Sequence, residues 1–317
     1  MPTAPSVTTP NFDPGAAYPQ VGQLRAAITA GDWTAVTAVF AGLEPAERTK
    51  LVQIGAEEPR VEALLRQALE RDPDDTLAAA MLGHHLIKAA WTVRTGARAQ
   101  YVSREQFATF FAILRQAEQI LIDAAARNPA DVSVWVARLI TARGLQLGLS
   151  EVRRRYDRLA AHDPHHLPGQ ETMLQSLCPK WGGDWEDLRR FVRECMLAAP
   201  EGSHNAVLVV QGHLERWLEL DPGADQRYLT SADVKAEIYE AAQRSVWHPQ
   251  FRRTIGWVSV RSTFAMAFSL MGDEEAAARE FVALGDFASE SFWQYLGDPV
   301  QEFRARRARA LAKGAKR

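Results

Sequence analysis

Histidine and cysteine are the residues of this chain whose spacing could support chemistry. The stretch AHDPHH brings together His162, Asp163, His165 and His166. Imidazole and carboxylate groups of this kind bind transition metals. A helix is expected to end at Pro164, because proline cannot continue one. Exposed loop histidines near a helix end are therefore the preferred interpretation, and a metal site is the alternative.

The segment CPKWGGDWEDLRRF, residues 178–191, is the second candidate for chemistry. Cys178 would be a nucleophile if a histidine approached it in space. It precedes Pro179 at the expected end of a helix, however, where the helix dipole favours the thiol over the thiolate. Lys180 stands before two glycines, which is not the order of a phosphate-binding loop. The segment is interpreted as a corner between helices, so no catalytic, cofactor-binding or metal-binding residue is nominated.

Composition limits the possible partners of the chain. With 37 basic and 39 acidic residues the formal net charge is -2, so nucleic acid and anionic membranes are not expected as partners. Two cysteines cannot build a disulfide framework, and no apolar run approaches the roughly 18 residues that span a bilayer. A cytoplasmic location is expected. Residues 1–19, which are rich in proline, are expected to form a disordered tail.

Helix-forming residues dominate the sequence, and degenerate repeats organise them. Prolines that follow helical patterns stand at Pro73, Pro129, Pro164 and Pro200, at intervals of 56, 35 and 36 residues. The last two intervals are close to the 34-residue period of tetratricopeptide (TPR) repeats. The first interval accommodates one such repeat with an insertion of about 20 residues, near 91–107. Apolar residues eight positions before the prolines, such as Leu65 and Leu121, are expected to pack between helices.

Five Gly-Asp pairs mark further helix boundaries, at residues 31–32, 183–184, 272–273, 285–286 and 297–298. Glycine adopts the left-handed conformation that ends a helix, and aspartate accepts hydrogen bonds from the first free N–H groups of the next. Each pair therefore predicts a corner between two helices.

The segment FAMAFSLMGDEEAAAREF resembles a TPR repeat most closely. Its matching small and aromatic positions are Ala265, Phe268, Gly272, Ala277 and Phe281. Leu82, Gly83 and Trp135 match in the same way. In addition, ARGLQLG at 142–148 followed by CPKWGG at 178–183 resembles a bacterial family of TPR-like helical proteins, over roughly residues 60–220. That second resemblance implies no activity, catalytic residue or ligand.

Resemblance to TPR proteins implies an all-α fold, a right-handed α-solenoid of antiparallel helix pairs whose concave groove binds a peptide or protein. Groove positions come from the first helix of each pair. They nominate His84, Lys88, Arg143, Glu171, Gln175, His204, Gln211 and Glu215. The mixed charge of this set differs from the basic clamp with which some family members hold a terminal carboxylate.

Two further segments are candidates for binding. The insertion near 91–107 combines arginine with aromatic residues and contains no acid before Glu105, a composition suited to an interface hot spot. Its candidate residues are Trp91, Arg94, Arg98 and Tyr101. Residues 304–317 are strongly basic and are expected to form a solvated tail, with nucleic-acid binding as the alternative.

The sequence therefore predicts one TPR-like repeat domain over 20–303 between two flexible ends. The expected function is non-enzymatic: a protein-protein interaction or scaffold module. The alternative is an enzyme or a metal-binding helical protein that uses the histidines near 162–166 and Cys178.

Overall fold

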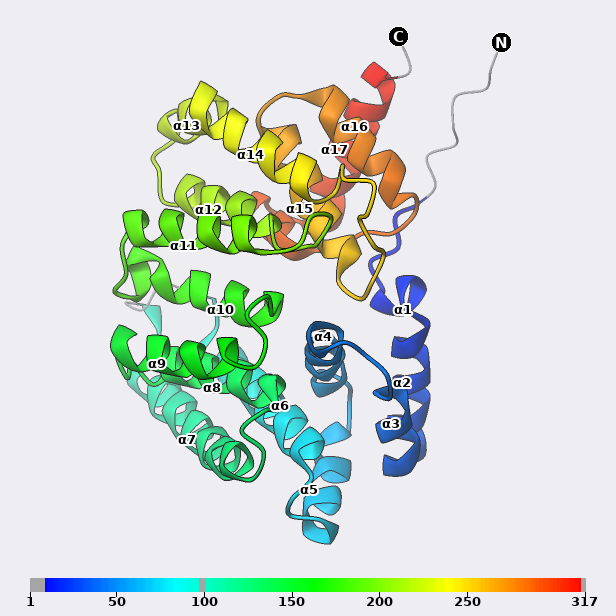
Figure 1. Ribbon diagram of the computed structural model, residues 1–317, viewed down its shortest axis with the longest axis vertical. Coiled ribbons are helices and arrows are strands. Elements are labelled where there is room, and N and C mark those ends of the chain that lie inside the picture. The colour runs from blue at the N-terminus through cyan, green and yellow to red at the C-terminus, as the bar shows by residue number, and fades with distance from the viewer. Residues whose placement is uncertain (1–8, 97–100, 315–317) are drawn as a thin grey trace. The chain divides into compact units, whose positions relative to one another are not determined.

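The computed structural model describes residues 9–96 and 101–314. Within these ranges the regular elements are α-helices, α1 to α17, and the short 3-10 helices η2 and η3. The expected all-α class is confirmed. The chain divides into two compact units, unit 1 (Met1–Tyr18 with Trp185–Arg317) and unit 2 (Pro19–Asp184), so the segment 20–303 contributes to both. Figure 1 labels the helices of each unit.

Unit 2 contains nine α-helices within its described residues, followed by η2. They are α2 (Pro19–Ala30), α3 (Trp33–Val39), α4 (Pro45–Ala56), α5 (Val61–Arg71), α6 (Thr76–Arg94), α7 (Arg104–Arg127), α8 (Val132–Gly144), α9 (Leu149–Ala160), α10 (Leu167–Leu177) and η2 (Pro179–Trp181).

The helices of unit 2 pack in two ways. From α5 to α10, each helix packs against the next one along the chain. The alternate helices also pack against one another: α6 contacts α4 and α8, α8 contacts α10, and α4 contacts α8 and α10 as well. Leu65 of α5 and Leu121 of α7 are fully buried at the positions predicted to pack between helices. Burying such a side chain contributes roughly 1.5–3 kcal/mol.

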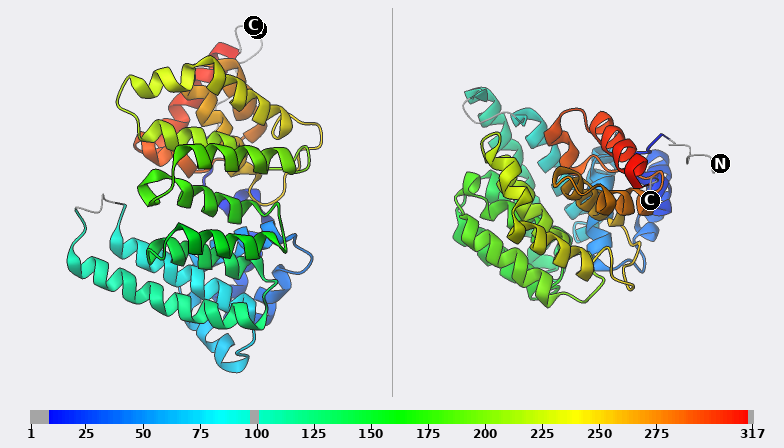
Figure 2. Two further views of the ribbon diagram at one scale, coloured as in Figure 1. Left: turned by 60° about the vertical axis from the view of Figure 1, so that its left-hand side comes forward. Right: turned by 90° about the horizontal axis from the view of Figure 1, so that it is seen from above.

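The α6–α7 hairpin contains the residues predicted as an insertion. Helix α6 continues to Arg94, and α7 begins at Arg104 with Ser103 and Gln106 in a capping box. The extra residues therefore lengthen both helices, and a short connection joins them. The C-terminal end of α6 and the N-terminal end of α7 extend beyond α8 and α9 (Figure 2). Arg98, nominated from the sequence, lies outside the described residues.

A buried ionic network joins three helices of unit 2. Glu118 of α7 accepts from Arg138 of α8 (3.1 Å) and from Arg155 of α9 (2.9 Å). Both arginines have little exposed surface, and Glu118 is buried. Removing one partner would leave an uncompensated buried charge, so a substitution of any of the three residues should destabilise unit 2.

Unit 1 is formed by the N-terminal residues and the second half of the chain. Its helices are α1 (Pro14–Ala17), α11 (Trp185–Ala198), α12 (Val207–Leu218), α13 (Ala224–Thr230), α14 (Ala232–Arg244), α15 (Trp257–Leu270), α16 (Glu274–Leu284), η3 (Ser291–Leu296) and α17 (Pro299–Gly314). Helix α12 is central, because it contacts α11, α13, α14 and α15.

The described part of the N-terminal segment packs within unit 1. The Asn11 N–H donates to the carbonyl of Asp286 (2.7 Å), and the Ala288 N–H donates to the carbonyl of Asn11 (2.9 Å). The ring of Phe12 meets that of Phe303 edge to face at 5.5 Å between centroids. Residues 9–18 of the predicted tail therefore have a defined place; residues 1–8 lie outside the described part.

The basic C-terminal segment, predicted as a tail from residue 304, belongs to α17 as far as residue 314. Arg307 and Ala310 are buried, and Arg309 pairs with Glu274 of α16 at 2.6 Å. Several basic residues of the C-terminal segment thus make contacts within unit 1.

The predicted helix boundaries largely agree with the structure. Pro73, Pro129, Pro164 and Pro200 follow the ends of α5, α7, α9 and α11. Four of the five Gly-Asp pairs precede a helix. The prediction is wrong at Gly285-Asp286, because the chain continues there into the backbone bridge with Asn11 and no helix begins. In the described ranges, no helix has the length and apolar character needed to cross a membrane.

Candidate functional site

Trp91 is the centre of an aromatic cluster in unit 2. Its indole meets Phe110 of α7 edge to face, with 5.0 Å between ring centroids. It meets Trp181 of η2 in the same manner at 5.8 Å. Aromatic pairs with this geometry contribute roughly 0.5–1.5 kcal/mol beyond their buried area. Aromatic residues of α6, α7 and η2 thus meet at the Trp91 indole.

Two arginines lie over these rings. The guanidinium of Arg94 is 5.4 Å from the centroid of Trp91 and 5.9 Å from that of Phe107. The guanidinium of Arg143 is 5.4 Å from the centroid of Trp181. Stacking of this kind holds the positive charge in a fixed place beside an apolar surface. We call this group the aromatic–arginine cluster; its members are Trp91, Arg94, Phe107, Phe110, Phe111, Arg143 and Trp181.

Most of the aromatic–arginine cluster is partly exposed. Phe110 is buried, and the other six members are intermediate between buried and exposed. Leu147, which follows α8, is 45% exposed, and Tyr101, which precedes α7, is 72% exposed. Partly exposed aromatic side chains and arginines are enriched at protein interfaces.

The two sequence motifs behind the family resemblance meet in this cluster. Arg143 belongs to the motif at 142–148, and Trp181 belongs to the motif at 178–183. The glycines allow the close packing: a Cβ on Gly144 would lie 2.5 Å from Leu114 Cδ1, and one on Gly183 would lie 2.1 Å from the carbonyl oxygen of Leu177. The corner interpretation of residues 178–183 agrees with this geometry.

The residues nominated for a concave groove are divided between the two units. Lys88 pairs with Glu57 at 2.9 Å, and Glu171 pairs with Lys50 at 2.6 Å. These pairs, with Arg143 and the half-buried Gln175, lie in unit 2. Of the full set, His84, Lys88, Arg143, Glu171 and Gln175 belong to unit 2, and His204, Gln211 and Glu215 belong to unit 1.

Three of the nominated groove residues offer almost no surface to a partner. His84, Gln211 and Glu215 are buried. Burial lowers the pKa of His84 to about 4, so this histidine stays neutral at neutral pH. His204 is half-buried, stacks on Phe251 at 5.0 Å, and its Nε2 lies 2.9 Å from the carbonyl oxygen of Arg252.

The histidines near 162–166 do not converge on one point. His162 is exposed, His165 is half-buried, and His166 is fully buried. His166 Nδ1 accepts from the Gly169 N–H and caps α10, so its Nε2 can donate to Thr49 Oγ1 at 3.0 Å. Burial lowers the pKa of His166 to about 4. No cluster of three or more His, Cys, Asp or Glu suited to a metal is present in residues 9–96 and 101–314.

Cys178 is buried, and its Sγ lies 3.6 Å from the carbonyl oxygen of Leu174. A thiol in this setting is shielded from substrates and donates to the backbone of α10. The enzyme and metal alternative, which relied on this residue and the nearby histidines, receives no support from these positions.

A polar group in unit 1, formed by His213, Tyr228 and Glu237, was not predicted from the sequence. His213 Nε2 lies 2.9 Å from Glu237 Oε2, and His213 Nδ1 lies 2.8 Å from the Tyr228 hydroxyl. The three residues belong to α12, α13 and α14, so no short spacing connects them. The packing of these helices brings them together.

Comparison with known proteins finds no matching family model, no matching curated protein and no matching solved structure. The resemblance to TPR-like proteins therefore stays a prediction.

Proposed function

We propose that this chain is a non-enzymatic interaction module, and that the aromatic–arginine cluster of unit 2 binds an acidic peptide segment that also contains aromatic or leucine side chains. The observation that carries the proposal is the partly exposed stack of arginines on aromatic rings. Tryptophan and arginine are the residues that most often dominate binding energy at interfaces.

Charge supports the choice of an acidic partner. Residues 76–104 contain no Asp or Glu and include Lys88, Arg94, Arg98 and Arg104. The guanidinium of Arg94, held on the rings of Trp91 and Phe107, can form hydrogen bonds with a carboxylate without first losing much side-chain freedom, and Arg143, whose Nε and one Nη are buried, adds positive charge beside Trp181. Apolar side chains of the same peptide would cover Trp91, Phe107 and Trp181.

A TPR-like, right-handed α-solenoid is part of the same proposal. In a repeat of helix pairs, the first helices stack on one another and line the groove. The contacts of α6 with α4 and α8, and of α8 with α10, support this arrangement. Trp91 and Arg94 lie near the C-terminal end of α6, Arg143 near that of α8, and Trp181 just after α10. The cluster thus lies at one end of three successive first helices.

The test is selection of binding peptides from a random displayed library against the full-length protein. We expect the selected peptides to combine Asp or Glu with Trp, Phe or Leu. The double variant Arg94→Glu with Arg143→Glu should weaken their binding by at least about tenfold, because it turns attraction into repulsion.

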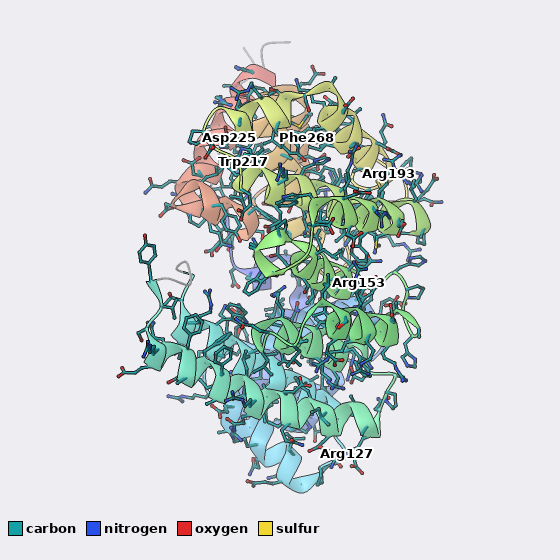
Figure 3. The ribbon with its side chains drawn as sticks, turned by 90° about the vertical axis from the view of Figure 1, so that its left-hand side faces the viewer. Arg127, Arg153, Arg193, Trp217, Asp225 and Phe268 are labelled. Carbon is teal, nitrogen blue, oxygen red and sulfur yellow. The ribbon has the colours of Figure 1, made fainter. Side chains whose placement is uncertain are left out.

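Arg127→Glu with Arg158→Glu is the matched control, since it makes the same charge change in unit 2. Arg127 lies at the end of α7 far from the α6–α7 connection (Figure 3), roughly 25 Å along the helix from Phe110. Selected peptides that bind both double variants equally well would refute the proposal.

A further inference from the structure

A cleft of about 110 Å³ lies in unit 1 between α11 and α14, and α12 and α13 complete its walls. We call it the α11–α14 cleft. Its apolar wall comes from Leu188, Val192 and Val209, and Trp185 lies at the start of α11. This volume is smaller than the cavity of about 150 Å³ that encloses benzene, so the α11–α14 cleft suits a ligand whose small apolar body projects in part to solvent.

The polar side of the cleft is organised by His213. Burial raises the pKa of Tyr228 to about 12, so its hydroxyl keeps its proton and can donate to His213 Nδ1. The His213 Nε2–H then donates to Glu237, whose pKa this hydrogen bond and Arg189 lower to about 2. The hydrogen-bonding groups of this wall are therefore satisfied without a ligand, and they hold Tyr228 and Glu237 in place.

Two of the three arginines that line the cleft, Arg189 and Arg193, pair with acidic side chains. Glu237 pairs with Arg189, and Arg193 pairs with Glu240 at 3.1 Å. Figure 3 labels Arg193 on α11. The guanidinium of Arg216 lies 5.0 Å from the centroid of Trp185, and no acidic side chain among the described residues is within ion-pair distance of it. The cleft thus carries one positive charge that a ligand can balance.

We propose that the α11–α14 cleft binds a small organic carboxylate. Its carboxylate would pair with Arg216, which can offer two parallel N–H groups. Its apolar body would lie against Leu188, Val192 and Val209. The apolar wall and the single unbalanced charge fit a small monoanion, such as benzoate or hexanoate, whose body lies partly in the cleft and partly in solvent.

Gly212 lets α11 and α12 approach closely at the apolar wall of the cleft. A Cβ at this position would lie 3.0 Å from Leu188 Cδ2 and 3.6 Å from Val192 Cγ2, two atoms of the apolar wall. A side chain at 212 would therefore displace Leu188, which forms part of the wall against which the body of the ligand would lie.

The experiment is calorimetric titration of the full-length protein with benzoate, hexanoate, benzamide and inorganic phosphate. We expect benzoate or hexanoate to bind, and benzamide and phosphate to bind at least about tenfold more weakly, because each lacks either the charge or the apolar body. Absence of binding by both carboxylates overturns the proposal, and so does phosphate that binds as tightly as benzoate.

Variants of Arg216 locate the site. Arg216→Gln should weaken carboxylate binding at least about tenfold, and Arg216→Lys, which keeps the charge, should retain most of it. The matched control is Arg190→Gln on α11: Arg190 pairs with Asp187 and Glu186 and does not line the cleft. Carboxylate binding that is equal in Arg216→Gln and Arg190→Gln overturns the proposal. If Arg216→Gln does not fold, Arg216→Met takes its place, and carboxylate binding equal to that of Arg190→Gln again overturns the proposal.

Discussion

At the scale of one residue, Gly183 shows why the segment 178–191, which is rich in reactive residue types, forms a corner between helices. Its Cα faces the carbonyl of Leu177 so closely that no side chain fits. Gly182, the residue before it, has φ +90°, in the left-handed region. The sequence predicted that these glycines end a helix. It did not predict that Trp181 packs beneath Arg143, because no spacing rule connects residues 38 positions apart.

Burial of single polar residues was the least predictable property. The spacing of a residue from the prolines places it on one face of a helix. It does not say how many faces of that helix are covered by other helices. Helix α12 contacts four other helices, so Gln211 and Glu215 are buried although they were nominated for a groove. The same is true of His84 on α6, which packs against α4, α5, α7 and α8.

The two buried histidines of unit 2 predict a pH dependence of stability. Burial lowers the pKa of His84 and of His166 from 6.5 to about 4. As the pH falls below 6.5, the unfolded chain takes up protons that the folded chain does not, so stability falls until the pH reaches about 4. Between pH 7 and pH 5 each histidine should cost roughly 2 kcal/mol of unfolding free energy.

Urea denaturation at the two pH values measures this loss. His84→Gln should reduce the difference in unfolding free energy between pH 7 and pH 5, and His162→Gln, at an exposed position, should leave it unchanged. A wild-type protein that is as stable at pH 5 as at pH 7 would show that these histidines are not buried in the neutral form.

At the scale of elements, helix ends were predictable because they depend on local chemistry. Asp32, Asp75, Asp131 and Asp273 each cap a helix through a side-chain oxygen. The lengths of α6 and α7 were not predictable from the repeat period, which allots the residues near 91–107 to an insertion. Their helical extensions are stabilised by tertiary contacts, such as that of Trp91 with Phe110.

Substitutions of Asp75 and Asp32 separate the contribution of a helix cap to the unfolding free energy from that of a tertiary hydrogen bond. Its Oδ1 accepts from the Ala78 N–H at 2.9 Å, and its Oδ2 accepts from Trp33 Nε1 at 2.7 Å. Asp75→Ala should lower the unfolding free energy by about 2 kcal/mol, since both hydrogen bonds are lost. Asp32→Ala, which removes a cap alone, should cost about 1 kcal/mol. Equal losses in urea denaturation would show that the bond to Trp33 contributes nothing.

At the scale of the whole molecule, the division into two units was not predicted. Composition marked residues 1–19 as a tail, because prolines are frequent and apolar residues are few. The contacts of residues 9–18 with Asp286, Ala288 and Phe303 are long-range, and no local pattern encodes them. The same limit applies to His213, Tyr228 and Glu237, which only helix packing brings together.

Removal of the N-terminal segment tests its place in unit 1. A chain that lacks residues 1–18 loses the backbone bonds of Asn11, the ring contact of Phe12, and the Tyr18 hydroxyl that accepts from the Val258 N–H at 3.1 Å. Amide hydrogen exchange in α15 and α17 should become at least about tenfold faster, and exchange in α6 to α8 should not change. Unchanged exchange in α15 and α17 would mean that the segment does not stabilise unit 1.

Photocrosslinking tests most directly whether the aromatic–arginine cluster binds a peptide. A photoreactive phenylalanine is placed at Tyr101, which is 72% exposed and lies at the α6–α7 connection, or at Tyr295 of unit 1, which is 49% exposed. With a peptide selected from the library, we expect crosslinks from position 101 and none from position 295. Crosslinks from position 295 alone would contradict the account.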